Sequence, residues 1–223
     1  FNMNLKKILS LPKSLYFNLK VFPLKTAIKL PILISYDTKI INIHKGSIII
    51  NSSIKPQMIQ IGFGGIDYIP NNRPSFLRID NGGKIIFNGT CQISSGSSIR
   101  ISKNGILDIG TNFSSNKNLI LSCDDLIKIG NNVLLGWNVN IRTGDGHYIY
   151  DLTTNIKNPI TKSVVIGNHV WVASYVHILK GSIIKDNCVL AYNSCTMTNF
   201  NETNCIIGGY PAKILRRNIN WHI

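Results

Sequence analysis

Aliphatic residues recur at every sixth position along one stretch of the chain. The first place of each six holds Ile166, Val172, Ile178, Ile184 and Leu190, and the slim fifth places hold Val170, Val176, Ser182, Cys188 and Ser194. A period of six fits neither a helix, with 3.6 residues per turn, nor a long strand, with a period of 2. A short extended piece followed by a corner explains it, with the first and fifth places turned inward. Since such a unit buries its apolar side only by stacking on its neighbours, the pattern predicts a hexapeptide-repeat β-solenoid.

The same period runs through most of the chain with local slips. It begins near Ile43 and is regular again from Ile129 to Ile141, and slips of two residues are tolerable because alternation returns the side chain inward. It fails between Ile141 and Ile166, where the sequence Gly-Asp-Gly-His occurs. Because long excursions in regular folds often carry function, we expect a solenoid over 39–213 with an active-site loop over 142–165.

Both ends of the chain depart from the period. In residues 3–38, leucines at near-helical spacing precede a proline, and six lysines occur before the first acid. This basic arm, expected to be helical, is either an amphipathic segment resting on an anionic membrane or a helical cover over the open end of the solenoid. We expect the tail, residues 214–223, to start as a short helix.

Composition narrows the class of partner. The 223 residues suit one elongated solenoid, and the net charge of +14 favours an anionic partner. No nucleic-acid-binding motif occurs, so we expect no nucleic acid. No apolar run is long enough to span a bilayer and no signal peptide is evident. The five cysteines lack metal-like pairing, which is typical of buried reduced thiols in a cytoplasmic protein. The basic arm fits association with the inner membrane face.

The sequence resembles the bacterial hexapeptide acyltransferases in three features: the six-residue repeats, the interruption with its histidine, and the ending GGYPAKILRR. The maltose/galactoside O-acetyltransferase type, with its relatives in polysaccharide gene clusters, is the most similar group. The resemblance implies an all-β fold, a left-handed parallel β-helix, although parallel crossovers are ordinarily right-handed. It also implies a homotrimer with active sites between neighbouring prisms. The donor would be acetyl-CoA and the acceptor a sugar hydroxyl of a cell-surface polysaccharide or its precursor, with no metal.

A sugar hydroxyl needs a base within hydrogen-bond reach before it attacks a thioester. His147 matches the family's catalytic histidine, which implies that it takes the hydroxyl proton and that its protonated ring then helps CoA leave. Asp145 matches the second acid of the Asp-x-Asp-x-His pattern of cluster-encoded relatives, whereas Thr143 replaces the first. Asp145 would hold the imidazole or contact the acceptor, unless it is a plain turn acid.

The same resemblance implies acceptor-binding residues. Asn138 matches a position where relatives often place Asn near the acceptor, and Trp137 replaces a smaller residue. Trp137 and Tyr148 are candidates for stacking on sugar faces, although loop aromatics pack on protein as often.

The donor site is implied in the same way. Ala173 and Ser174 match the small corner positions of the CoA groove, and Tyr192 stands where relatives have Ala or Gly. Lys213 and Arg216 match a basic pair near the CoA phosphates, where cations are required.

Two other classes remain open. A γ-type carbonic anhydrase uses the same solenoid with three histidines on zinc, and the candidates here are His147, His169 and His177. A non-catalytic scaffold or sugar-binding module is the second alternative.

Overall fold

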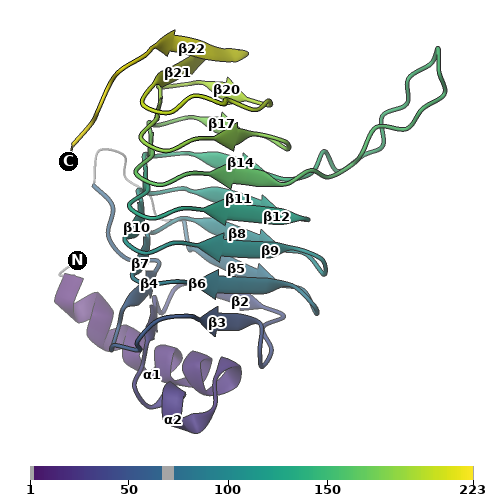
Figure 1. Cartoon of the computed structure of the whole chain (residues 1–223). Coiled ribbons are helices and arrows are strands. Elements are labelled where there is room, and N and C mark those ends of the chain that lie inside the picture. Colours follow the sequence, from purple (N-terminus) through teal and green to yellow (C-terminus); the bar gives the residue numbers. More distant parts are fainter. Residues whose placement is uncertain (1–2, 67–72, 223) are drawn as a thin grey trace.

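The chain winds into a triangular prism with one parallel sheet on each side (Figure 1). The structure, a computed structural model, describes residues 3–66 and 73–222. Sheet A contains β1 (Ile32–Ile34), β4 (Ile59–Ile61), β7 (Cys91–Ile93), β10 (Phe113–Ser115), β13 (Leu134–Leu135), β16 (Trp171–Val172), β19 (Val189–Leu190), β21 (Ile206–Gly209) and β22 (Ala212–Arg216). Sheet B contains β2 (Lys39–Ile41), β5 (Phe76–Ile79), β8 (Ser98–Ile101), β11 (Ile120–Cys123), β14 (Asn140–Arg142), β17 (His177–Ile178) and β20 (Cys195–Thr196). Sheet C contains β3 (Ile48–Ile50), β6 (Lys84–Phe87), β9 (Ile106–Ile109), β12 (Leu126–Ile129), β15 (Val164–Ile166) and β18 (Ile183–Ile184).

Inward-facing aliphatic side chains form the core of the prism. The predicted inward residues of the regular stretch are buried, and Val172, Ile178 and Leu190 have no exposed surface. The slips in the period have a plain structural meaning. Stacked partners lie 22 residues apart at Ser98 and Ile120, 20 apart at Ile120 and Asn140, and 18 apart from β17 to β20. Because all three steps are even, the same face of each strand stays inward.

The lower end of the prism is closed by α1 (Met3–Val21), with α2 (Leu24–Ala27) after it. Polar side chains of α1 face the protein and replace the missing neighbour of the edge strand β1. Ser14 Oγ accepts from the Ile34 N–H (2.9 Å) and donates to its carbonyl (3.1 Å), and Asn18 does the same for Ile32. The helix therefore satisfies backbone groups that an uncovered edge strand would leave open to another chain.

The opposite face of α1 is apolar and open to solvent. Leucines, isoleucines and a tyrosine there are each at least 38% exposed: Leu5, Ile8, Leu9, Leu11, Leu15, Tyr16 and Leu19, continued by Leu24 and Ile28. The predicted cover over the solenoid is thus present, but the helical part ends at Ala27 and the solenoid already begins with β1, earlier than the expected residue 39.

The expected helix over residues 214–223 is wrong for the part that the structure describes. β22 turns back after Tyr210 and Pro211 and pairs antiparallel with β21, with a bulge between Ile206 and Ile207. The physical reason is the same as at the lower end of the prism. Because β21 is the last strand of the parallel stack, its unpaired backbone groups need partners, and pairing with β22 supplies them. After Arg216 the described tail has no helix and runs back down the prism (Figure 1).

Candidate functional site

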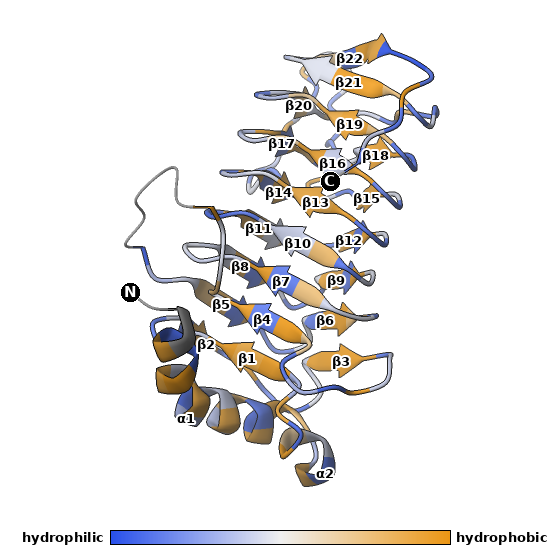
Figure 2. Cartoon of the chain, turned by 90° about the vertical axis from the view of Figure 1, so that its left-hand side faces the viewer, coloured by the Kyte–Doolittle hydropathy of each residue, from blue (hydrophilic) through white to orange (hydrophobic). Residues whose placement is uncertain are grey.

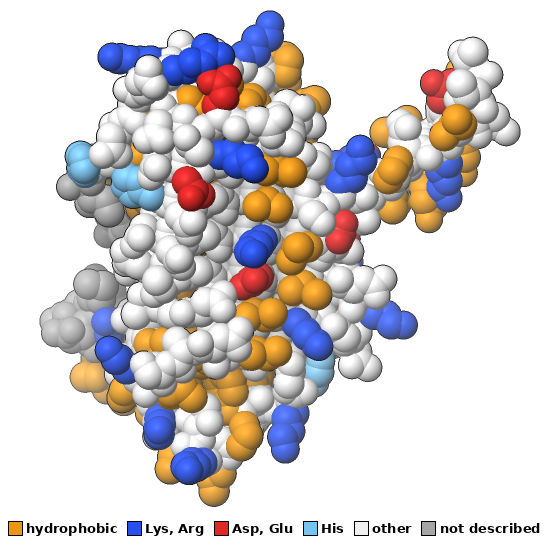
Figure 3. Space-filling view, viewed as in Figure 1, with side chains coloured by type: hydrophobic (Ala, Val, Ile, Leu, Met, Phe, Trp, Pro, Cys, Tyr) orange, Lys and Arg blue, Asp and Glu red, His pale blue; other side chains and the backbone are white. Residues whose placement is uncertain are grey.

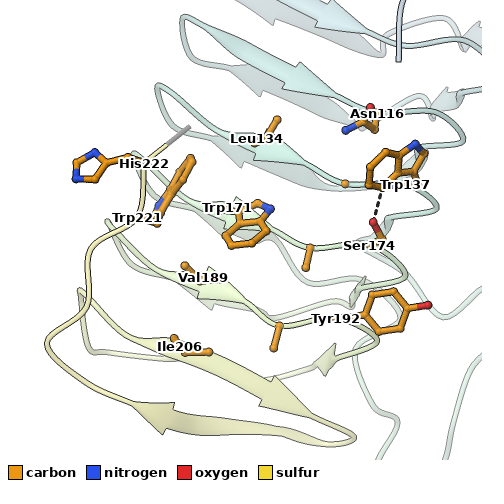
Figure 4. A pocket seen from close by; sticks show the side chains of 13 residues that line it. Asn116, Leu134, Trp137, Trp171, Ser174, Val189, Tyr192, Ile206, Trp221 and His222 are labelled. Carbon is orange, nitrogen blue, oxygen red and sulfur yellow. Dashed lines mark hydrogen bonds between the residues drawn. The ribbon is translucent and has the colours of Figure 1, made fainter. Parts of the chain in front are cut away.

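A groove of about 640 Å³ lies on the outer face of sheet A, where the corner toward sheet B begins (Figure 4). Its lining is mostly apolar and aromatic: Asn116, Leu134, Gly136, Trp137, Trp171, Ala173, Ser174, Val189, Ala191, Tyr192, Ile206, Trp221 and His222. Four of the residues predicted to bind donor or acceptor are therefore brought together, namely Trp137, Ala173, Ser174 and Tyr192.

The corner under the groove is tightly packed. The Trp137 N–H donates to Ser174 Oγ (3.1 Å), and the Trp137 ring N–H donates to the Ile66 carbonyl (3.2 Å). A Cβ on Gly136 would approach Ser174 N to 2.7 Å, so the stacked turns tolerate only glycine there. Ser174 is therefore held as part of the wall, while the Tyr192 ring, 66% exposed, stands at the rim.

The far wall of the groove comes from the chain's tail. The Trp221 ring stacks on His169 with centroids 4.4 Å apart, and its N–H donates to the His169 carbonyl (2.9 Å). Trp171, 39% exposed, lies at 6.2 Å from the Trp221 ring. Sequence reasoning missed Trp221, because nothing in the sequence indicates where an aperiodic tail will dock.

His147 lies in a hairpin loop that projects far from the prism between β14 and β15 (Figure 1). Antiparallel bridges join Gly144 to Thr161 and Tyr150 to Lys157, so the loop is ordered as a two-stranded ribbon. The His147 side chain is exposed. Tyr148 is 54% exposed on the same ribbon, with Lys157 Nζ 3.0 Å from its ring centroid.

The base of the ribbon is tied to the prism by Asp145, whose carboxylate forms an ion pair with Lys180. Among the described contacts no hydrogen bond joins Asp145 to His147. Thr143, which departs from the acidic pattern, is buried, and its hydroxyl accepts from the N–H groups of Asp124 (2.7 Å) and Asp125 (3.2 Å). The structure therefore gives this threonine a structural role.

The two halves of the predicted site lie on different corners of one chain. Trp137 stands between β13 and β14, at the corner from sheet A to sheet B, whereas the ribbon leaves the next corner, from sheet B to sheet C. One chain therefore does not place its own His147 beside its own groove.

The remaining predicted residues lie near the groove but outside its lining. Asn138 adopts a left-handed conformation (φ 56°), which asparagine tolerates, and its side-chain carbonyl accepts from Asn118 (3.0 Å). Lys213 and Arg216 are exposed on β22. The bulge falls between Ile214 and Arg216, so Lys213 lies opposite Gly208 and Arg216 opposite Ile206. Since Gly208 and Ile206 are two positions apart on β21, both charges lie on the same face of the sheet.

The positions of the histidines and cysteines do not support a metal site or a cysteine nucleophile. His147 is on the ribbon, His169 at the corner from sheet C to sheet A, and His177 on sheet B, and no group of three metal-ligating side chains occurs in residues 3–66 and 73–222. All five cysteines are free and buried. Burial raises the pKa of Cys123 to about 11, so this thiol stays protonated near neutral pH.

Comparison with known proteins supports the fold. Residues 163–196 match the family model "Bacterial transferase hexapeptide (six repeats)". The galactoside O-acetyltransferase of Escherichia coli (strain K12) is 33% identical over 110 residues, 49% of this chain and 53% of that protein. The polysialic acid O-acetyltransferase of Escherichia coli O1:K1 / APEC is 28% identical over 66% of this chain and 44% of its own length. The chain thus spans about half the length of these curated relatives.

A solved structure agrees over more of the chain. The polysialic acid O-acetyltransferase OatWY superposes with a TM-score of 0.53 at 28% identity, covering 84% of this chain and 88% of its own. The three-sheet coil is the left-handed parallel β-helix that the family resemblance implied, and the chain carries hexapeptide repeats and is similar to the bacterial sugar O-acetyltransferases.

Proposed function

We propose that this protein transfers an acetyl group from acetyl-CoA to a sugar hydroxyl of a cell-surface polysaccharide or its precursor. The observation that carries the proposal is the pairing of two features: an apolar groove with small corner residues, and a histidine on an ordered ribbon. Relatives with these repeats are named as galactoside and polysialic acid O-acetyltransferases.

The groove suits the donor. Ala173 and Ser174 leave room for a slender chain such as pantetheine, and Trp171 and Trp221 supply an apolar wall. The basic residues belong to the same end of the molecule, since Arg216 pairs with the groove residue Ile206 across β21 and β22. Figure 3 shows basic side chains gathered at this upper end, where they suit the phosphates of CoA.

His147 acts as the general base in this proposal. It accepts the proton of the sugar hydroxyl while the oxygen attacks the thioester carbonyl, and it returns the proton to the leaving thiolate. Trp137, Tyr148 and Asn138 are proposed to hold the acceptor. Asp145, through Lys180, holds the ribbon in place.

The protein is proposed to act as a homotrimer, because the ribbon and the groove lie on different corners. A heterologous contact that closes into a ring lets the ribbon of one chain reach the groove of the next, and every site is then complete. The length and projection of the ribbon support this arrangement (Figure 1).

The outward face of α1 supports peripheral contact with an anionic membrane, with the protein at the cytoplasmic side of the inner membrane. Nine exposed apolar residues lie on or just after the helix, and no acidic residue precedes Asp37. Lys6 and Lys13 are used internally, since Lys6 pairs with Asp37 and Lys13 donates to backbone carbonyls. An apolar face beside free lysines is typical of helices in the membrane interface. Among the described residues no helix has the length and apolarity to cross a bilayer.

Vesicle flotation tests this contact. With vesicles containing phosphatidylglycerol, the variant carrying Ile8→Ser, Leu15→Ser and Leu19→Ser should float much less than the parent protein. Ile120→Ser, which removes from sheet B an isoleucine about as exposed as Leu15 and Leu19, should float normally. Equal flotation of all three proteins would contradict the proposed membrane contact. If the triple variant instead forms a smaller oligomer than the parent in gel filtration, this face binds a second copy of the chain.

Activity is tested by following acetyl-CoA consumption against a panel of sugars and glycan precursors. His147→Ala should lower turnover by about 10²–10⁴-fold, the usual contribution of a general base, with folding intact by circular dichroism. A protein that binds glycans but consumes no acetyl-CoA with any acceptor would instead be a sugar-binding module.

A further inference from the structure

The corners on either side of sheet A carry ladders of residues in the left-handed backbone conformation. At the corner from sheet C to sheet A, stacked coils place there Asn112, Asn132, His169, Asn187 and Asn204. At the corner from sheet A to sheet B, they place there Asn118, Asn138, Tyr175 and Asn193. Asparagine tolerates this conformation better than most residues, so its repetition follows from the geometry of the turn.

The coil that carries β16 departs from both ladders. His169 takes the place of asparagine on one side of β16 (φ 51°), and Tyr175 takes it on the other side (φ 62°). A positive φ suits a bulky side chain poorly, so the tyrosine in particular adds backbone strain. Since strained residues of this kind cluster where a ligand is bound, the two replacements indicate a function for this coil.

Each replacing ring packs on an aromatic ring that borders the groove proposed for the donor. His169 lies flat against Trp221, with ring centroids 4.4 Å apart and an interplanar angle of 9°. Tyr175 lies against Tyr192, with ring centroids 5.4 Å apart and an interplanar angle of 57°. Figure 4 shows Trp221 and Tyr192 at opposite sides of the groove with Trp171 between them. One coil therefore supports both side walls of the groove.

The Trp221 wall uses the stack on His169 for its orientation and other contacts for its attachment. The tail that carries Trp221 descends from β22 to the level of β16, along a face with hydrophobic colour on β13, β19 and β21 (Figure 2). Arg217 of this tail pairs with Glu202. The Trp221 ring N–H donates to the backbone carbonyl of His169 (2.9 Å), which a different side chain would leave in place. Changing the His169 side chain should thus remove the stack and leave the tail docked.

The Tyr192 wall is the more exposed of the two. The Tyr192 side chain is 66% exposed, whereas Trp221 is 8% exposed. An exposed ring moves among rotamers unless a neighbour restricts it. Tyr175 supplies such a neighbour, and an asparagine in its place, as in the coils above and below, would offer no ring to hold Tyr192.

We propose that His169 and Tyr175 are positioning residues for the donor, because they hold Trp221 and Tyr192 as the two walls of a slot that binds the pantetheine arm of CoA. The inference rests on the proposed function, since it takes CoA as the occupant of the groove. It adds two residues that do not line the groove themselves. Walls that are held in advance lose less conformational freedom when the ligand binds. Donor affinity therefore depends on turns that are not the most stable ones for this coil.

Equilibrium titration of the full chain with CoA tests the proposal without acetyl transfer. His169→Asn and Tyr175→Asn should each weaken CoA binding about three- to tenfold, as expected when one aromatic contact is lost. Neither variant should lower the urea midpoint, because asparagine suits the left-handed conformation and restores the ladder. Tyr175→Phe keeps the ring and should retain the affinity that Tyr175→Asn loses.

Gln57→Asn is the matched control. Gln57 also has a left-handed conformation (φ 54°), and it lies between β3 and β4 at the lower end of the prism, outside the lining of the groove. Asparagine should suit this turn equally well, and CoA binding should stay as in the parent. A loss of CoA affinity in Gln57→Asn as large as in the other two variants would overturn the assignment to His169 and Tyr175.

The other outcomes separate this inference from the proposed function. If the parent binds CoA and both asparagine variants bind it equally well, the positioning role is overturned and the donor stands. If affinity and urea midpoint fall together, the two rings support the fold and not the donor, which also overturns the inference. If the parent itself binds no CoA, the proposed donor is overturned and this inference falls with it.

Discussion

If the active site forms between chains, two inactive variants should restore each other's activity. The first variant, His147→Ala, lacks the base on the ribbon. The second, Ala173→Phe, fills the groove at a position that is small and half-buried. The two residues lie on different corners of one chain, so a mixed ring contains sites that take the intact ribbon of one variant and the intact groove of the other.

The size of the effect follows from the geometry of a closed ring. When equal amounts of the two variants assemble at random, each site receives an intact ribbon with a chance of one half and an intact groove with a chance of one half. About one quarter of the sites are then complete. Since His147→Ala alone should retain at most about 1% of the parent's turnover, mixing should raise activity at least about 25-fold.

The assay is acetyl-CoA consumption by co-expressed or refolded mixtures, with ring assembly checked by gel filtration. A chain carrying both substitutions, mixed equally with the parent chain, is the matched control. That mixture should fall to about one quarter of the parent's activity if the site is shared, and to about one half if it lies within a chain. Failure of the two single variants to complement, together with the value of one half, would refute the shared site.

Three further predictions concern the supports of the site and the fold. Asn18→Ala leaves the buried N–H and carbonyl of Ile32 in β1 without these partners, and it should lower the free energy of unfolding by about 1–4 kcal/mol in urea titrations. This range already allows for the slightly higher helix propensity of alanine. The control Asn201→Ala, at an exposed position, should change the free energy of unfolding little. Asp145→Asn and Lys180→Met should reduce turnover equally, and the double variant no further; a much larger loss for Asp145→Asn alone would mean that the acid takes part in the reaction. The hydrogen bond from Arg78 lowers the pKa of Asp80. The stability that the ionised Asp80 adds is therefore present above the ordinary aspartate pKa near 4 and is lost as the pH falls through the lowered pKa. Asp80→Asn should reduce the drop in urea midpoint between about pH 7 and pH 3, and an unchanged drop would contradict this.

Much of the fold could be predicted from local pattern. Alternation along short strands is a property of neighbouring residues, so Val172, Ile178 and Leu190 were predicted to lie inside and do so. The interruption before Ile166 likewise marked a long loop, which the structure shows as the ribbon. The corner at Ala173 and Ser174 was instead implied by the family resemblance, and both residues line the groove. The ends were less predictable: both are decided by the need of an edge strand for partners, and the sequence of an edge strand does not say what will cover it.

The sequence by itself thus determined the coil, the place of its one long interruption and the imidazole within it. Only the tertiary structure decided that α1 turns serine and asparagine inward and its leucines outward, that Lys213 and Arg216 lie on a strand, and that Trp221 closes the groove. It also decided that ribbon and groove occupy different corners. The physical reason is that a six-residue period is set by local geometry, whereas these placements depend on pairing and packing between residues far apart in the chain.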